Sequence, residues 1–163
     1  MRTRKITYSA IAAAIVFLVT WIVKLPVPGT SGAYLNFGDV VITMTAFLLG
    51  GPAAAASAAV GSCLADIAVG SAVYAVPTFF IKGLMALACG AVSRKKTARG
   101  YILSGFVGGA IMTAGYGLFE IFFFGTAYAA VSLPFNLIQW FAGAAAAAVL
   151  LPAVRRLEKG ISL

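Results

Sequence analysis

Residues 101–124 read YILSGFVGGAIMTAGYGLFEIFFF, and Glu120 is the single charged residue among them. A helix needs about 20 predominantly apolar residues to cross the hydrocarbon core of a bilayer, so this stretch predicts a transmembrane helix. The whole chain has the same character, since 62% of its 163 residues are hydrophobic and 10% are charged. A soluble domain carries about 25% charged residues. The sequence therefore predicts an all-α integral membrane protein and excludes a disordered chain, a disulfide scaffold and a large soluble module.

Further apolar runs lie on both sides of this stretch, separated by glycine, proline or charged residues. We predict one membrane domain over residues 1–163 with six transmembrane helices, at residues 6–24, 37–49, 53–69, 76–92, 101–124 and 133–154. The second run would rise only ~20 Å as a helix, so we expect it to be short, tilted or partly re-entrant. The outer loops are then residues 25–36, 70–75 and 125–132.

The net charge of +8 comes from 12 lysines and arginines against 4 acidic residues. Most of these cations fall in three short clusters: Arg2, Arg4 and Lys5; Arg94, Lys95, Lys96 and Arg99; and Arg155, Arg156 and Lys159. Such clusters mark cytoplasmic segments of a membrane protein. We therefore predict a plasma-membrane protein with several crossings, in which both termini and the 94–99 loop lie on the cytoplasmic side. This pattern argues against nucleic-acid binding. The first cluster and its apolar run also resemble a secretory signal, but the run ends in Lys-Leu-Pro rather than at a small-residue cleavage site.

Several kinds of chemistry are absent from the sequence. It has no histidine and no GxxxxGK[ST] motif, and no two of its acidic residues have the spacing of a general acid and base. We therefore predict no catalytic residue, no metal site and no cofactor. An uphill transport step would have to draw on an ion gradient or on ATPase partners.

Four ionisable residues fall inside the predicted spans: Asp39, Asp66, Lys82 and Glu120. Charges at membrane depth are costly and usually functional. By the predicted topology all four lie in the outer half of the membrane, so we expect a polar pocket that opens outward. The alternatives are that Asp39 and Asp66 order helix ends or loops, and that Lys82 and Glu120 form only a structural ion pair.

Uncharged polar and aromatic residues show the same outward bias. Asn136, Gln139 and Trp140 share one face of the sixth span, and Tyr116 lies one turn before Glu120. A pocket with a few polar groups among aromatic rings suits a small flat organic ligand. The predicted binding residues are Asn36, Asp39, Tyr74, Lys82, Tyr116, Glu120, Asn136, Gln139 and Trp140. For Tyr74 and Trp140 the alternative is an ordinary aromatic residue of the membrane interface.

The first span carries small residues in its cytoplasmic half. Ala10 and Ala14 have small-xxx-small spacing, and so do Ser9 and Ala13. This spacing lets helix backbones approach closely in lipid. The pattern fits packing within the chain, or a smooth face that docks another membrane protein.

Four motifs resemble those of a known family when taken in order: YLNFGD at residues 34–39, LGGP at 49–52, PTFFIKG at 77–83 and YGLFE at 116–120. They are similar to the substrate-binding S components of energy-coupling factor (ECF) transporters. The resemblance implies a six-span subunit that captures a vitamin or precursor from outside. It also implies a transmembrane T component and two cytoplasmic ATPases as partners, and delivery of the ligand by toppling in the bilayer.

The resemblance also suggests roles for particular residues. The first-span contact with the T component corresponds best to Ala10 and Ala14, with the Ser9 and Ala13 register left open. The motifs look closest to the branch with riboflavin-like, pyridoxine-like and hydroxymethylpyrimidine-like ligands, and a pyridoxine or pyrimidine ligand is the first expectation.

Within the pocket, we expect Lys82 and Glu120 to anchor the ligand, and Asn36, Asn136 and Gln139 to bind ring heteroatoms. Tyr74, Tyr116 and Trp140 would stack on or cover the ring, and residues 25–36 would form a lid.

Two other classes of protein remain as alternatives from the sequence. A stand-alone secondary transporter or channel would need ionisable groups through the full membrane depth, which the inner half lacks. A membrane scaffold or an unrecognised intramembrane enzyme would not need polar residues gathered toward the outside.

Overall fold

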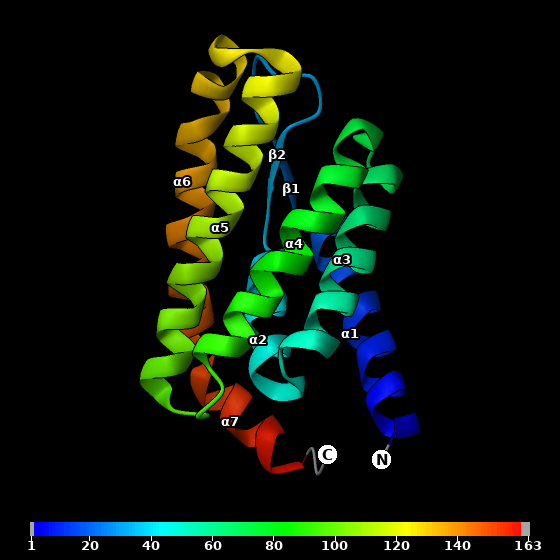
Figure 1. The fold of residues 1–163 in the computed structure, drawn as a ribbon, viewed down its shortest axis with the longest axis vertical. Coiled ribbons are helices and arrows are strands. Elements are labelled where there is room, and N and C mark those ends of the chain that lie inside the picture. The colour runs from blue at the N-terminus through cyan, green and yellow to red at the C-terminus, as the bar shows by residue number, and fades with distance from the viewer. Residues whose placement is uncertain (1, 161–163) are drawn as a thin grey trace.

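The computed structural model describes residues 2–160 as a helical bundle with one short hairpin (Figure 1). The elements are, in chain order, α1 (Arg2–Ile22), β1 (Lys24–Pro26), β2 (Tyr34–Asn36), α2 (Gly38–Leu49), α3 (Gly51–Ala68), α4 (Ala72–Val92), α5 (Ala98–Phe124), α6 (Thr126–Val149) and α7 (Leu151–Gly160).

Five of these helices, α1, α3, α4, α5 and α6, are long and apolar enough to cross a membrane. The helical architecture confirms the predicted fold class. Helix α2 is shorter: its 12 residues rise ~18 Å, whereas the 27 residues of α5 rise ~40 Å. A complete sixth crossing at α2 therefore stays a prediction.

Single glycines make two of the helix connections. Gly50 joins α2 to α3 with a φ of 89°, and Gly125 joins α5 to α6 with a φ of 88°. Glycine adopts this left-handed backbone without steric cost. As a result α6 already begins at Thr126, and the expected outer loop at residues 125–132 is almost entirely helical. The expected span 133–154 is also divided, because α6 ends at Val149 and α7 starts at Leu151.

The first outer loop, which the sequence predicted without regular structure, forms an antiparallel hairpin. Lys24 pairs with Asn36, Leu25 with Leu35, and Pro26 with Tyr34. The hairpin runs between the α3–α4 pair and the α5–α6 pair (Figure 1). It leads directly into α2, so non-helical backbone enters the bundle.

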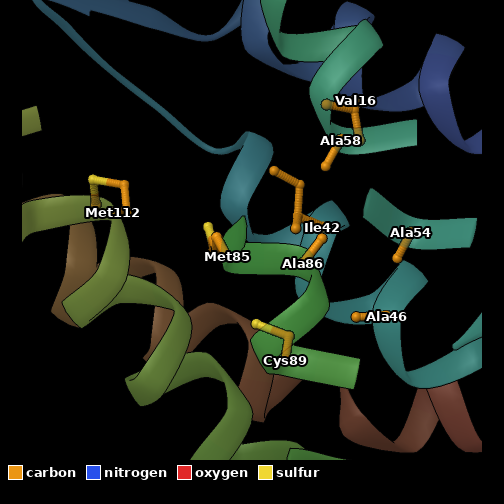
Figure 2. Close-up of a cluster of buried hydrophobic side chains, with 9 residues drawn as sticks. All are labelled: Val16, Ile42, Ala46, Ala54, Ala58, Met85, Ala86, Cys89 and Met112. Carbon is orange, nitrogen blue, oxygen red and sulfur yellow. The ribbon is translucent and has the colours of Figure 1, made fainter. Parts of the chain in front are cut away.

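The apolar core lies where α1 to α5 meet (Figure 2). Ile42 of α2 is fully buried at its centre, between Val16 of α1 and Met85 of α4. Most of the remaining members are small: Ala46, Ala54, Ala58, Ala86 and Cys89, together with Met112. Small side chains let the short α2 pack closely among its neighbours.

The basic clusters gather at one end of the molecule, where α1 begins, α4 turns into α5, and α7 ends (Figure 1). Lys96 in this turn donates a hydrogen bond from Nζ to the Leu48 carbonyl at 3.2 Å, and its Nζ lies 4.8 Å from the centre of the Phe47 ring. The turn therefore holds the C-terminal end of α2. The shared end agrees with the predicted topology, in which the positive-inside rule places this end in the cytoplasm.

Helices α3 and α4 cross closely at this same end. A Cβ atom placed on Gly90 of α4 would collide with the backbone of Gly51 at the start of α3. Backbone atoms cannot move aside as a flexible side chain can, so this contact requires glycine at position 90. A Cβ atom placed on Gly117 of α5 would meet no neighbouring heavy atom within 4 Å, so that position provides a comparison.

We expect Gly90→Ala to destabilise the protein by about 1–3 kcal/mol, because the added methyl forces α3 and α4 apart. Gly117→Ala is the matched control and should have little effect or be slightly stabilising, since alanine favours helix. Thermal unfolding of both purified variants in detergent measures the difference. Equal unfolding temperatures would contradict the close crossing.

Candidate functional site

The polar residues of the outer half surround a cavity beneath the hairpin. Strand β2, the end of α3, and helices α4, α5 and α6 contribute to its wall. The polar lining residues are Tyr34, Asn36, Asp66, Tyr74, Thr78, Tyr116, Glu120, Asn136 and Gln139. Six of these were predicted from the sequence: Asn36, Tyr74, Tyr116, Glu120, Asn136 and Gln139.

A buried ion pair lies below the cavity. Lys82 of α4 contacts the carboxylate of Asp39 of α2, and the two residues are 2% and 5% exposed. Lys82 lies halfway along α4, and Asp39 is at the start of the short α2. The pair is therefore near the middle of the bundle rather than in its outer half, where the sequence placed it. Neither residue lines the cavity.

Gln139 of α6 connects this ion pair to the cavity floor. Its Nε2 donates to Asp39 Oδ2 at 2.8 Å, and its Oε1 accepts from the backbone N–H of Asn36 at 2.9 Å. The side chain of Asn36 in turn accepts from the backbone N–H of Gly38 at 3.0 Å. These bonds satisfy the backbone where the hairpin passes into α2, as the membrane interior demands.

A second polar network closes the outer part of the cavity. Glu120 of α5 accepts hydrogen bonds from the hydroxyl of Tyr74 at 3.0 Å and from that of Ser132. The Tyr74 hydroxyl also shares a hydrogen bond with Tyr128 at 3.0 Å. Glu120 and Lys82, considered as a possible ion pair from the sequence, therefore have separate partners.

Tyr34 of the hairpin donates a hydrogen bond to Oδ1 of Asp66 at the end of α3. Burial and the neighbouring carboxylate raise the pKa of the Tyr34 phenol, so it is the donor in this contact. Nearby, the hydroxyls of Thr78 and Tyr116 exchange a hydrogen bond of 2.9 Å. The Tyr34 bond ties the hairpin to α3 over the cavity.

Two polar atoms of the wall have no hydrogen-bond partner among residues 2–160: Oδ2 of Asp66 and Nδ2 of Asn136. One is an acceptor and the other a donor. Buried polar atoms are normally paired, so unpaired atoms beside a cavity indicate where a ligand can bind.

Trp140, like Asp39 and Lys82, is a predicted binding residue that does not line the cavity. Its ring fills the space beside Gly109 of α5, where a Cβ atom would collide with it, and it stacks on Phe141 with ring centroids 5.2 Å apart. The spacing placed Trp140 on the same helix face as Asn136 and Gln139. Of these three residues, Asn136 and Gln139 line the cavity and Trp140 does not.

The sequence-based set of binding residues omitted Tyr34, Asp66 and Thr78. Asp66 had a visible signal as one of the few charges at membrane depth, and the sequence left open that it only ordered a helix end. Tyr34 belongs to one of the family motifs, but its contact with Asp66 joins residues 32 positions apart. Thr78 also belongs to a family motif, but its contact with Tyr116 joins residues 38 positions apart.

The small-residue face of α1 has two different sides. Ser9 and Ala13 face α3: the Ser9 carbonyl accepts from Ser57 at 2.8 Å, and a Cβ on Gly61 would touch the Ala13 carbonyl. Ala10 and Ala14 are exposed. The Ser9 and Ala13 register therefore packs within the chain, and the Ala10 and Ala14 register is free.

Within residues 2–160, no three His, Cys, Asp or Glu side chains come together as a metal site would require. The cavity offers hydroxyls, amides, carboxylates and aromatic rings. Such an arrangement can bind and orient an organic molecule.

Comparison with known proteins agrees with this geometry. The sequence model of the family described as "ECF-type riboflavin transporter, S component" matches residues 1–156. The chain is 40% identical over 102 residues to an uncharacterized protein of Pyrococcus woesei. The aligned residues cover 62% of this chain and 68% of that protein. Its fold is similar to a solved structure described as "Structure and mechanism of the S component of a bacterial ECF transporter", with a TM-score of 0.78 and 20% identity over 96% of this chain and 98% of that one.

The family match covers almost the whole chain and confirms the resemblance and the multi-pass membrane location that the sequence predicted. The chain belongs to the family of ECF-type S components, the membrane-embedded subunits that bind the substrate of a vitamin transporter.

Proposed function

We propose that this S component binds riboflavin, or another small heteroaromatic vitamin of similar shape, in the cavity beneath the hairpin. The observation that carries the proposal is that Asn136 Nδ2 on α6 and Asp66 Oδ2 on α3 are both unpaired in the lining of the same cavity. They call for a ligand with both an acceptor and a donor, as the pyrimidine edge of a flavin has. Riboflavin comes first because the matching family is described by it; pyridoxine and hydroxymethylpyrimidine have related edges.

The remaining lining residues fit the same kind of ligand. Tyr74 and Tyr116 provide aromatic rings, and Asn36, Gln139 and Glu120 provide polar groups around them. Lys82 and Asp39 act from below by holding Gln139 in place. We therefore assign both residues a supporting role. This assignment replaces the expectation that Lys82 anchors the ligand directly.

Ligand entry requires the hairpin to move. The gaps between the lining residues amount to about 410 Å³ when the space open to solvent is counted, but the part wide enough for water is about 30 Å³. That is room for one or two water molecules. We propose that residues 25–36 act as the lid, and that the Tyr34–Asp66 hydrogen bond breaks or shifts when the ligand enters.

Transport requires partners in this proposal, since the sequence carries no ATP-binding P-loop. A T component and two cytoplasmic ATPases would supply the energy, while this chain binds the ligand without chemical change. The exposed Ala10 and Ala14 on α1 are the proposed contact with the T component. Two small residues one turn apart let another transmembrane helix approach closely.

The first test is binding by the purified protein. We expect Asn136→Ala to weaken riboflavin binding by roughly tenfold, because the ligand loses one buried hydrogen bond. Trp140→Phe, on the same helix but outside the cavity, is the control and should bind as the wild type does. Flavin fluorescence quenching gives both affinities, and pyridoxine and hydroxymethylpyrimidine are measured by calorimetry. The proposal fails if none of the three is bound, and an equal loss in both variants would contradict the assigned wall.

The second test concerns the buried ion pair. Lys82→Met should destabilise the protein by about 3–5 kcal/mol, since it leaves the Asp39 carboxylate buried without its cation. The double variant Asp39→Asn/Lys82→Met removes both charges and keeps an acceptor for Gln139, so we expect it to recover most of that loss. Unfolding in detergent measures both. A double variant no more stable than Lys82→Met would show that the pair is not coupled.

The third test separates binding from transport. Ala10→Trp and Ala14→Trp should abolish vitamin uptake in cells that carry the T component and ATPases, because the bulky ring blocks helix approach. Binding by the purified variants should be unchanged. Ile22→Trp, an exposed position at the other end of α1, is the control and should leave uptake intact. Loss of binding in the alanine variants would instead give these residues a structural role.

A further inference from the structure

The chain contains four acidic side chains, and the structure describes all of them. Asp39 pairs with Lys82, and Glu158 of α7 pairs with Arg155. Asp66 and Glu120 have no cationic partner among residues 3–160, whose side chains the structure describes. Both line the vitamin cavity, and they are 3% and 1% exposed.

These two carboxylates differ in how their oxygens are used. Both oxygens of Glu120 accept hydrogen bonds, one from Tyr74 and one from Ser132. Asp66 accepts from Tyr34 through Oδ1, and its Oδ2 has no donor among residues 2–160. The hydroxyl of Thr78, which is close by, exchanges a hydrogen bond with Tyr116. A buried acceptor without a donor is costly, so the empty position at Asp66 is the one that a ligand donor would fill.

No cation is paired with Asp66 or Glu120 among the described residues, and this limits the ligand charge that the cavity can bind. A negative group on a ligand would find no cation to pair with in this buried site, and burying an unpaired charge is costly. Lys82, which lies below the cavity, is already paired with Asp39. A site that leaves a ligand charge buried and unpaired is an effective means of excluding the wrong ligand.

We infer that Asp66 is a specificity-determining residue: its free oxygen accepts a hydrogen bond from an N–H or O–H group of the ligand, and with Glu120 it excludes phosphorylated forms of the vitamin. This inference rests on the proposed function. The subunit would then take up the free vitamin and leave the phosphate ester outside.

The experiment compares riboflavin with riboflavin 5′-phosphate, and pyridoxine with pyridoxine 5′-phosphate, on the purified full-length protein. For whichever free vitamin binds, we expect its phosphate ester to bind at least tenfold more weakly. This comparison needs no variant and therefore does not depend on the folding of a mutant.

Asp66→Asn keeps the shape of the side chain but removes its charge. It should weaken binding of the free vitamin about tenfold and reduce the preference over the phosphate ester at least threefold. Glu158→Gln, which neutralises a carboxylate outside the cavity, is the matched control and should change neither value. Thermal unfolding of each variant verifies that it is folded.

Two results would overturn the inference alone: equal binding of a vitamin and its phosphate ester, or an Asp66→Asn variant with wild-type affinity and preference. Failure of both free vitamins and of hydroxymethylpyrimidine to bind would overturn the proposed function, and this inference with it. The two failures are therefore distinguishable.

Discussion

The contact between Lys82 and Asp39 holds together the part of the bundle on which the cavity depends. Helix α2 has 12 residues, and before it the chain runs as non-helical backbone within the bundle, where each polar backbone group needs a partner. Asp39 stands at that transition, and through Gln139 it is linked to the backbone of Asn36. The ion pair thus makes it possible for a hairpin to enter the membrane domain and form a cavity wall.

The sequence predicted the helices well because their signal is local. Runs of apolar residues define transmembrane helices by length alone, and the positions of the cations agree with the observed clustering at one end (Figure 1). Connections were harder. One glycine at position 125 replaces an expected loop of eight residues, because a positive φ allows α5 to turn directly into α6. No pattern of hydrophobicity reports such a backbone angle.

The cavity was predicted in outline but not in its pairings. The outward bias of polar residues located it, and six of nine proposed residues line it. Partners distant in sequence could not be derived: Lys82 is 43 residues from Asp39, and Gln139 is 100 residues from it. The orientation of the Trp140 ring could not be predicted either, because the ring occupies the space that a side chain at Gly109 of α5 would fill.

The arrangement separates three tasks within a small chain. Both side-chain polar atoms of Asp39 and of Gln139 have hydrogen-bond partners within the protein, and Lys82 is paired with Asp39, so these residues form the floor. Asp66 and Asn136 keep one polar atom free, so the wall retains binding capacity. The exposed alanines of α1 are on a helix that contributes nothing to the cavity lining. Helix α2 contacts α1 and α3 as well as α4, α5 and α6, so the floor of the cavity is packed directly against the helix that carries the exposed alanines.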